Sequence, residues 1–329
     1  MPSGHITRLG AAAALTLVTG LAAATPAIGE TGSGNAGDPA PGGVPVERWS
    51  GQRAMADIAA QLRFTPRSLE SPGPAMTIDF IRAELAKTSV EKIEIQHWQR
   101  RDDDGAVHAL TNIIARFDAS NPRRRIVGTH YDSIVRAYRD PNRPDAPMPG
   151  ANNSASGVAL LLETARVLSA LPKPAVAVDL VFFDGEEGPK SLGAGDPNWE
   201  ALGSPHFAAH LADVYAGRRP EDAVVFDMVC YDKLQLNPEL SSLAYAKPQV
   251  TKFWDIGREI APAIFLEKPT EFAVGDDHTA LAAAGIPSLL VIDFKYDPWF
   301  NTTMDTIDKC SAASLEAVGR TLLRYLYAP

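Results

Sequence analysis

The sequence is poor in cysteine and in positive charge, and each shortage excludes a class of protein. Only two of its 329 residues are cysteines, Cys230 and Cys310, which excludes a disulfide scaffold and a cysteine-based zinc module. Lysine and arginine number 31 against 40 aspartates and glutamates, a net charge of −9, so no basic surface for nucleic acid is expected. With 45% hydrophobic and 22% charged residues, the chain has the composition of a globular protein.

The N-terminus carries an apolar segment that stands apart from the rest. Arg8 is the only formal charge before Glu30, an apolar run follows it over residues 9–24, and small residues at 22–27 suit a signal peptidase. This pattern is typical of a secretory signal peptide, and the run is short for a membrane span. We therefore predict a signal peptide over residues 1–27, cleaved or retained as an anchor, and a secreted, periplasmic or otherwise extracytoplasmic protein.

After this segment the composition changes to that of a linker and then to that of a folded domain. Residues 28–46 are dense in glycine, proline, serine and aspartate, which favours a flexible linker. No later change in composition divides the chain. We therefore predict a single domain over residues 47–329.

Apolar runs of strand length alternate with helical patterns along this domain. Strands are predicted at residues 113–117, 125–130, 176–183, 224–229 and 288–292, and helices at 155–171 and 314–327. Several strand runs lack polar residues at alternate positions, which suits strands that are covered on both faces. The sequence therefore predicts the α/β class, with a mostly parallel twisted central sheet flanked by helices.

Polar side chains gather at the ends of the predicted strands, where the chemistry of parallel sheets takes place. They occur in the segments 130–133, 184–187 and 276–278, and Asp227 lies within an otherwise apolar strand. The segment 184–187 has two adjacent glutamates, so one can bind a metal while the other serves as a base. Each segment alone could be a solvated turn, but together they are typical of a metallohydrolase.

Six short motifs follow one another along the domain. They are His-Tyr-Asp-Ser at 130–133, Pro-Gly-Ala-Asn-Asn-Ser-Ala-Ser-Gly-Val at 149–158, Phe-Phe-Asp-Gly-Glu-Glu at 182–187, Phe-Asp-Met at 226–228, Asp-Asp-His at 276–278 and Trp-Phe-Asn-Thr at 299–302. Their order resembles zinc exopeptidase (metallopeptidase) family 28, and the resemblance extends over residues 58–327. Within that family the chain is most similar to the glutaminyl cyclases, because of the segments 67–72, 182–187, 202–204 and 276–278.

The resemblance implies a division of roles among the site residues. Glu187 would bind zinc, Glu186 would act as general acid and base, and Asp227 and Asp276 would belong to the same hydrogen-bonded set. In glutaminyl cyclases zinc polarises the γ-carboxamide of an N-terminal glutamine, the α-amine attacks it, and ammonia leaves. The expected function is thus conversion of glutamine to pyroglutamate at the N-termini of peptides or proteins. A zinc aminopeptidase of the same family, in which Glu186 activates a water molecule, is the alternative within catalysis.

Two residues depart from the family pattern, and both occupy metal-ligand positions. Asn153 replaces the aspartate of the Pro-Gly-Ala motif, and Asn301 replaces the histidine before the final threonine. Amide oxygens are poor zinc ligands, so the expected zinc site is weakened. His130 and Asp227 remain, and with Asn153 they could hold a single metal, so one metal or none is expected. A natural non-catalytic peptide-binding relative, an enzyme with altered metal use and a site inactivated by design all remain open.

Three further features leave alternatives open. Trp299 and Phe300 fall where the family places aromatic side chains beside the substrate, but packing at the rim of the site explains them equally well. Cys230 and Cys310 could form a disulfide or stay as two buried thiols. Glycosylation sequons begin at Asn152 and Asn301, and we interpret both as chance matches. We expect a monomer whose only membrane contact is its export signal.

Overall fold

The computed structural model describes residues 43–69, 71–189 and 199–329. The predicted signal peptide and most of the predicted linker lie outside these residues. Val44 and Val46, at the end of that linker, pack against the hydrophobic core. Over the described ranges, no helix combines the length and the apolar composition that a membrane span requires.

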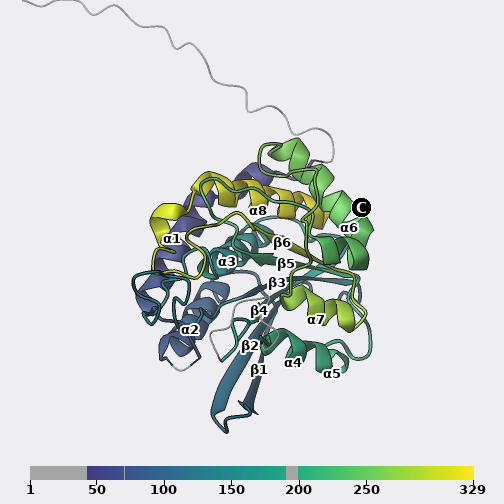
Figure 1. Ribbon diagram of the computed structural model, residues 1–329. Coiled ribbons are helices and arrows are strands. Elements are labelled where there is room, and N and C mark those ends of the chain that lie inside the picture. Colours follow the sequence, from purple (N-terminus) through teal and green to yellow (C-terminus); the bar gives the residue numbers. More distant parts are fainter. Residues whose placement is uncertain (1–42, 70, 190–198) are drawn as a thin grey trace, which may run out of the picture. The chain divides into compact units, whose positions relative to one another are not determined.

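Within the described residues six strands form one sheet, in the order β1-β2-β4-β3-β5-β6 (Figure 1). The strands are β1 Lys92–Arg101, β2 Val107–Arg116, β3 Arg124–His130, β4 Ala177–Phe183, β5 Asp222–Asp227 and β6 Ser288–Ile292. The four strands β4, β3, β5 and β6 run parallel to one another, whereas β2 runs antiparallel to both β1 and β4. The predicted mostly parallel sheet is confirmed.

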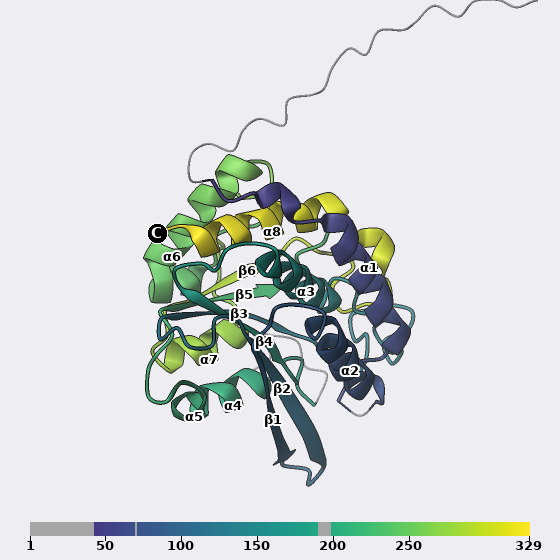
Figure 2. The same cartoon turned by 180° about the vertical axis from the view of Figure 1, so that it is seen from behind.

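The structure differs from the sequence prediction mainly at the antiparallel edge. The run predicted at 113–117 is the end of β2, which begins at Val107. The apolar pattern does not predict β1, because this strand is largely exposed and rich in polar and charged residues. The two strands form a hairpin that extends beyond the rest of the fold (Figures 1 and 2). The strand predicted at 224–229 ends at Asp227, so this residue lies at a strand end rather than inside the strand.

Helices cover both faces of the sheet (Figures 1 and 2). One face carries α1 Gly51–Gln61, α2 Gly73–Leu85, α3 Ala155–Ser169, α6 Leu240–Ile260 and α8 Ala312–Tyr327, and the other carries α4 Gly203–Ala209, α5 Leu211–Tyr215 and α7 Asp277–Ala283. Short 3-10 helices span Val46–Arg48, Leu62–Phe64 and Ile307–Lys309. In β5, Val224 and Phe226 belong to the hydrophobic cluster on the face that carries α1, α3 and α8. Ala223 and Val225 belong to the cluster on the opposite face. Burial on both faces explains the strand runs without polar alternation.

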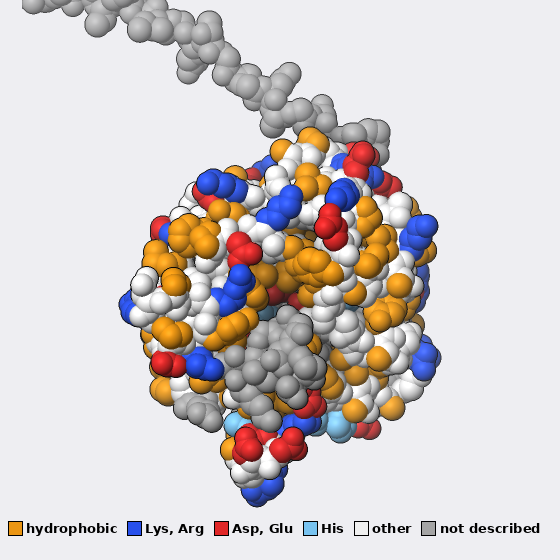
Figure 3. Space-filling model, viewed as in Figure 1, with side chains coloured by type: hydrophobic (Ala, Val, Ile, Leu, Met, Phe, Trp, Pro, Cys, Tyr) orange, Lys and Arg blue, Asp and Glu red, His pale blue; other side chains and the backbone are white. Residues whose placement is uncertain are grey.

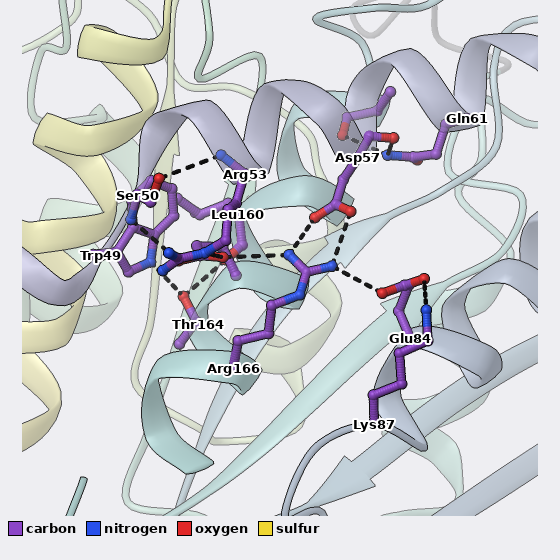
Figure 4. A network of polar contacts seen from close by, with 12 residues as sticks. Trp49, Ser50, Arg53, Asp57, Gln61, Glu84, Lys87, Leu160, Thr164 and Arg166 are labelled. Atoms are coloured by element: carbon purple, nitrogen blue, oxygen red, sulfur yellow. Dashed lines mark hydrogen bonds and ion pairs between the residues drawn. The ribbon is translucent and has the colours of Figure 1, made fainter. Parts of the chain in front are cut away.

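A network of ion pairs joins α3 to α1 and α2 (Figure 4). Arg166 of α3 lies 2.7 Å from Asp57 of α1 and 3.1 Å from Glu84 of α2, measured between guanidinium nitrogens and carboxylate oxygens. Glu163 is fully buried and bonds to Arg53 of α1. The polar side chains Glu163 and Arg166 of α3 are therefore covered by neighbouring helices, which accounts for the burial of this helix on nearly all sides.

A disulfide bond joins Cys230 to Cys310. Cys230 lies three residues after β5, and Cys310 lies two residues before α8. Of the two alternatives left open by the sequence, the structure shows the paired one. The bond ties the chain after β5 to the segment that leads into the last helix.

Candidate active site

The parallel strands end at one edge of the sheet, and their ends carry the candidate site. His130 is the last residue of β3, Asp227 is the last residue of β5, and Glu186 and Glu187 follow β4 after a short turn. In the sheet His130 pairs with Phe183, the last residue of β4. Residues distant in the sequence thus meet where parallel α/β sheets commonly bind ligands.

His130 is held between carboxylates. Its Nε2 atom lies 3.2 Å from Asp227 Oδ1 and 3.9 Å from Glu186 Oε2, and its Nδ1 atom lies 3.3 Å from Asp132 Oδ1. Burial alone would lower the pKa of His130, but the hydrogen bonds with Asp132 and Asp227 and the charges of Glu186 and Asp227 together raise this pKa well above its usual value. The imidazole therefore supplies positive charge to an otherwise acidic site.

Asp132 also fixes the backbone of the two glutamates. Its Oδ1 atom accepts the N–H of Glu186, and its Oδ2 atom accepts the N–H of Glu187, each at 3.1 Å. Gly185 makes the preceding turn with a φ of +67°, and a Cβ at this position would lie 3.0 Å from Leu110. Glycine and Asp132 together determine where the two carboxyl groups point.

Glu186 and Asp276 retain their protons more strongly than ordinary carboxyl groups. Burial raises the pKa of Glu186 well above its usual value; His130 opposes this shift, and the charges of Asp276 and Glu187 add to it. Burial also raises the pKa of Asp276, and the charge of Asp227 adds to that shift. Asp276 caps α7, because its Oδ1 atom accepts the N–H of the next residue at 2.5 Å. The site is a buried set of acids that can hold and move a proton.

The structure brings together Asn153, Glu187 and Asn301, the three positions of the expected zinc site. Asn153 Nδ2 donates to Glu187 Oε1 at 2.6 Å and to Asn301 Oδ1 at 3.3 Å. The amide nitrogen of Asn153, which cannot bind a metal, thus faces both Glu187 and Asn301. Asn153 Oδ1 and Asn301 Nδ2 are buried, and neither has a hydrogen-bond partner among the described residues.

These residues do not fit zinc. Zinc sites in proteins use cysteine, histidine and carboxylate ligands, and here only Glu187 is of that kind. The other half of the family's site, His130 and Asp227, is paired within itself. In the part of the chain that the structure describes, no group of three or more histidine, cysteine, aspartate or glutamate side chains is arranged to hold a metal ion.

Two supporting residues are absent from the sequence prediction of the site. Asp305 accepts the N–H groups of Asn152 and Asn153 at 2.9 and 3.0 Å, and burial raises its pKa to about 6. Arg67, named above only within a family segment, donates to the carbonyl oxygens of Tyr131, Pro149 and Gly150 at 2.7–3.2 Å. Asp305 therefore fixes the turn that carries Asn153, and Arg67 joins that turn to the end of β3. Only the nearness of Asp305 to Asn301 in the sequence could have suggested its role.

A cavity of about 310 Å³ opens over these groups. Figure 3 shows acidic side chains at the bottom of a hollow surrounded by hydrophobic ones. The polar lining residues include Asn153, Glu186, Glu187, Asp227, Asp276 and Asp293, and the apolar ones include Phe272, Ile292, Phe294 and Phe300. Of the two predicted substrate-binding aromatics, Phe300 lies in the described wall. Trp299 is outside this lining, with Lys309 Nζ 4.7 Å from the centre of its ring.

Known proteins share this fold and parts of this sequence. The model of peptidase family M28 matches residues 112–326. The aminopeptidase YwaD of Bacillus subtilis (strain 168) is 28% identical over 210 residues, which are 61% of this chain and 40% of that protein. The chain therefore spans less than half the length of this curated relative.

Two solved structures are similar over nearly their whole length. A glutaminyl cyclase of Tannerella forsythia has a TM-score of 0.78 and 28% identity, with 85% of this chain and 99% of that chain covered. A Zn-dependent exopeptidase of Parabacteroides distasonis has a TM-score of 0.78 and 26% identity, with 85% and 99% covered. Since the family model covers more than half of the sequence, the chain belongs to peptidase family M28.

Proposed function

We propose that the protein converts N-terminal glutamine of peptides to pyroglutamate and releases ammonia. The observation that carries this proposal is Glu186, a buried acid with a raised pKa that lines the cavity and is fixed through its backbone by Asp132. The similarity to a solved glutaminyl cyclase supports it. A cavity of about 310 Å³ suits one terminal residue rather than a long stretch of peptide.

The reaction needs one proton to move between two nitrogen atoms of the substrate. The α-amine attacks the carbon of the γ-carboxamide, which forms the new carbon–nitrogen bond of the ring. Glu186 takes a proton from the attacking nitrogen and delivers it to the carboxamide nitrogen. The old carbon–nitrogen bond then breaks, ammonia leaves, the carbonyl re-forms, and Glu186 returns to its starting state.

The neighbouring groups suit Glu186 to this role. A proton-transfer group works best when its pKa lies near the working pH, and burial moves the pKa of Glu186 in that direction. The charges of Asp276 and Glu187 strengthen its hold on a proton, whereas His130 weakens it. Bound peptide would exclude water from the cavity, which favours attack by the amine over hydrolysis.

A peptide assay tests this proposal. Purified protein is mixed with a glutamine-initiated peptide, and ammonia and the peptide mass are measured. We expect ammonia release by the wild type, a loss of roughly 100-fold or more in Glu186→Gln, and no change in Glu271→Gln, whose side chain is 78% exposed.

Two results would count against cyclisation. If ammonia release does not exceed the rate in buffer alone, the protein is not a cyclase under these conditions. That result would favour the non-catalytic, peptide-binding alternative. Release of free amino acid from a leucine anilide, without cyclisation, would favour the aminopeptidase alternative, which the retained pair of His130 and Asp227 supports.

A further inference from the structure

A fully buried glutamate lies behind one wall of the cavity. Glu239 is 0% exposed and comes directly before α6, where its side chain accepts the N–H groups of Ser241 and Ser242 at 2.8 and 2.6 Å. This contact caps the helix. Helices are normally capped by the shorter side chains of serine, threonine, aspartate or asparagine, so a glutamate at this position indicates a further requirement.

Two other contacts of Glu239 lie on either side of Asp276 in the sequence. Glu239 Oε1 accepts the N–H of Val274 at 3.0 Å, and Oε2 lies 3.4 Å from Nε2 of His278. Val274 lines the cavity two residues before Asp276, and His278 follows Asp276 by two residues in α7. One carboxylate therefore holds the chain on both sides of Asp276, whose charge acts on Glu186.

The segment that Glu239 holds has few other polar anchors. All of residues 271–275 except Val274 are exposed. Among the described residues, Val274 is the only one of this segment whose N–H donates to another protein group, and Glu239 is its acceptor. Hydrogen bonds to a charged acceptor are stronger than those to a neutral one. This bond is therefore the main polar contact that fixes the wall.

Glu239 keeps its charge although it is buried. Burial would raise its pKa, but hydrogen bonds with His278, Ser241 and Ser242 lower this pKa well below its usual value. Ser242 Oγ donates to Glu239 Oε2 at 2.7 Å and accepts the N–H of Leu290 in β6 at 2.9 Å. The carboxylate is thus anchored to both α6 and β6, which makes it a firm support for the wall.

We propose that Glu239 is a positioning residue that holds the cavity wall at Val274 and the acid Asp276 in their working places. Glu239 does not line the cavity, so it acts through these two residues. Its effect on the reaction rests on the proposed function: when the wall moves, Asp276 shifts relative to Glu186. A misplacement of about 1 Å in an active site can cost roughly 100-fold in rate.

Two conservative substitutions separate this role from helix capping. Glu239→Asp keeps a carboxylate that can cap α6, but its side chain is shorter by one methylene and no longer reaches Val274 and His278. Glu239→Gln keeps the length and one oxygen that can accept the N–H of Val274. A residue that only caps the helix would tolerate aspartate better, whereas a positioning residue would tolerate glutamine better.

Steady-state kinetics of the full chain with a glutamine-initiated peptide tests the proposal. We expect kcat to fall roughly 10-fold to 100-fold in Glu239→Asp, with a smaller change in KM, and to stay within about threefold of the wild type in Glu239→Gln. The matched control is Glu267→Asp, because Glu267 is exposed and outside the cavity lining. It should leave both constants unchanged. Full kcat in Glu239→Asp, or an equal loss in both variants at Glu239, would overturn the inference.

Hydrogen exchange of backbone amides, followed by NMR, gives a second readout that needs no turnover. The Val274 amide should exchange at least about tenfold faster in Glu239→Asp than in the wild type, because it loses a charged acceptor. The amides of α8 should be unchanged. Equal acceleration at Val274 and in α8 would mean global destabilisation and would also overturn the inference.

The two readouts distinguish failure of the inference from failure of the proposed function. A wild type that does not cyclise the peptide refutes only the proposed function, because exchange at Val274 still tests the positioning. Cyclisation that is insensitive to Glu239→Asp refutes only the inference.

Discussion

Asp132 holds Glu186 through its backbone: Asp132 Oδ1 accepts the N–H of Glu186 at 3.1 Å. The same oxygen lies 3.3 Å from Nδ1 of His130. One carboxylate therefore orients both the proposed proton-transfer group and the imidazole next to it, although it does not line the cavity itself.

Asp132→Asn should impair turnover more than peptide binding. The amide nitrogen of asparagine replaces one carboxylate oxygen, so one of the two backbone N–H groups of Glu186 and Glu187 loses its acceptor. We expect kcat to fall roughly 10-fold to 100-fold while KM changes little, since Asp132 acts through positioning. Steady-state kinetics with a glutamine-initiated peptide measures both constants.

The matched control for this variant is Asp145→Asn, whose side chain is 85% exposed. It should leave both constants unchanged. An Asp132→Asn protein with full kcat would show that the turn after β4 holds Glu186 in place without this carboxylate.

The central strands could be predicted because their surroundings leave a clear pattern in the sequence. Residues 288–292 have the predicted bounds in β6, where all five side chains are buried. The prediction fails at β1, because an edge strand in a projecting hairpin buries few side chains. Strands that pack on both faces have continuous apolar runs, so the parallel part of the sheet could be predicted from the sequence. The edge strand β1 lacks such a run and could not be predicted.

The site could be predicted where its residues lie at strand ends, as with His130, Glu186 and Glu187. It could not be predicted where contacts depend on tertiary structure. Asp305 is separated by 152 residues from Asn153, whose N–H it accepts, and no local pattern indicates that contact. The hydrogen bond between Asn153 and Glu187 likewise joins residues that only the fold brings together.

Asp293→Asn should stabilise the protein at neutral and higher pH. Burial raises the pKa of Asp293 to about 7, and its Oδ2 atom has no partner among the described residues. In the unfolded chain this carboxyl ionises near pH 4. The folded state therefore loses stability relative to the unfolded state as the pH rises from about 4 to about 7, and this loss disappears in Asp293→Asn.

Urea unfolding at a series of pH values measures this effect. Above pH 7 the Asp293→Asn protein should exceed the wild type by roughly 4 kcal/mol, and below pH 4 the two should be alike. Asp103→Asn, at an exposed position in the hairpin, should show no such dependence. A constant difference across the whole range would contradict the assigned pKa.

Arg166→Met should destabilise the contact of α3 with α1 and α2 (Figure 4). The substitution leaves Asp57 without its cation and takes one of two cations from each of Glu84 and the buried Glu163, which keep Lys87 and Arg53 respectively. Since the side chain of Arg166 is 25% exposed, we expect a loss near the lower end of the range for buried pairs, about 3 kcal/mol. Chemical denaturation provides the measurement.

The comparison variant is Arg136→Met, which breaks an exposed pair with Asp145 at 3.2 Å. It should change the free energy of unfolding by less than about 0.5 kcal/mol. Equal effects of the two substitutions would mean that burial does not distinguish the two networks.

The central claim is that the side chains of this site cyclise N-terminal glutamine without zinc. The direct test is ammonia release from a glutamine-initiated peptide by wild-type protein that has been stripped with a chelator and checked for metal content. We expect turnover to persist after stripping, to stay within about twofold when zinc is added, and to disappear in Glu186→Gln. Turnover that vanishes on stripping and returns with zinc would contradict the claim.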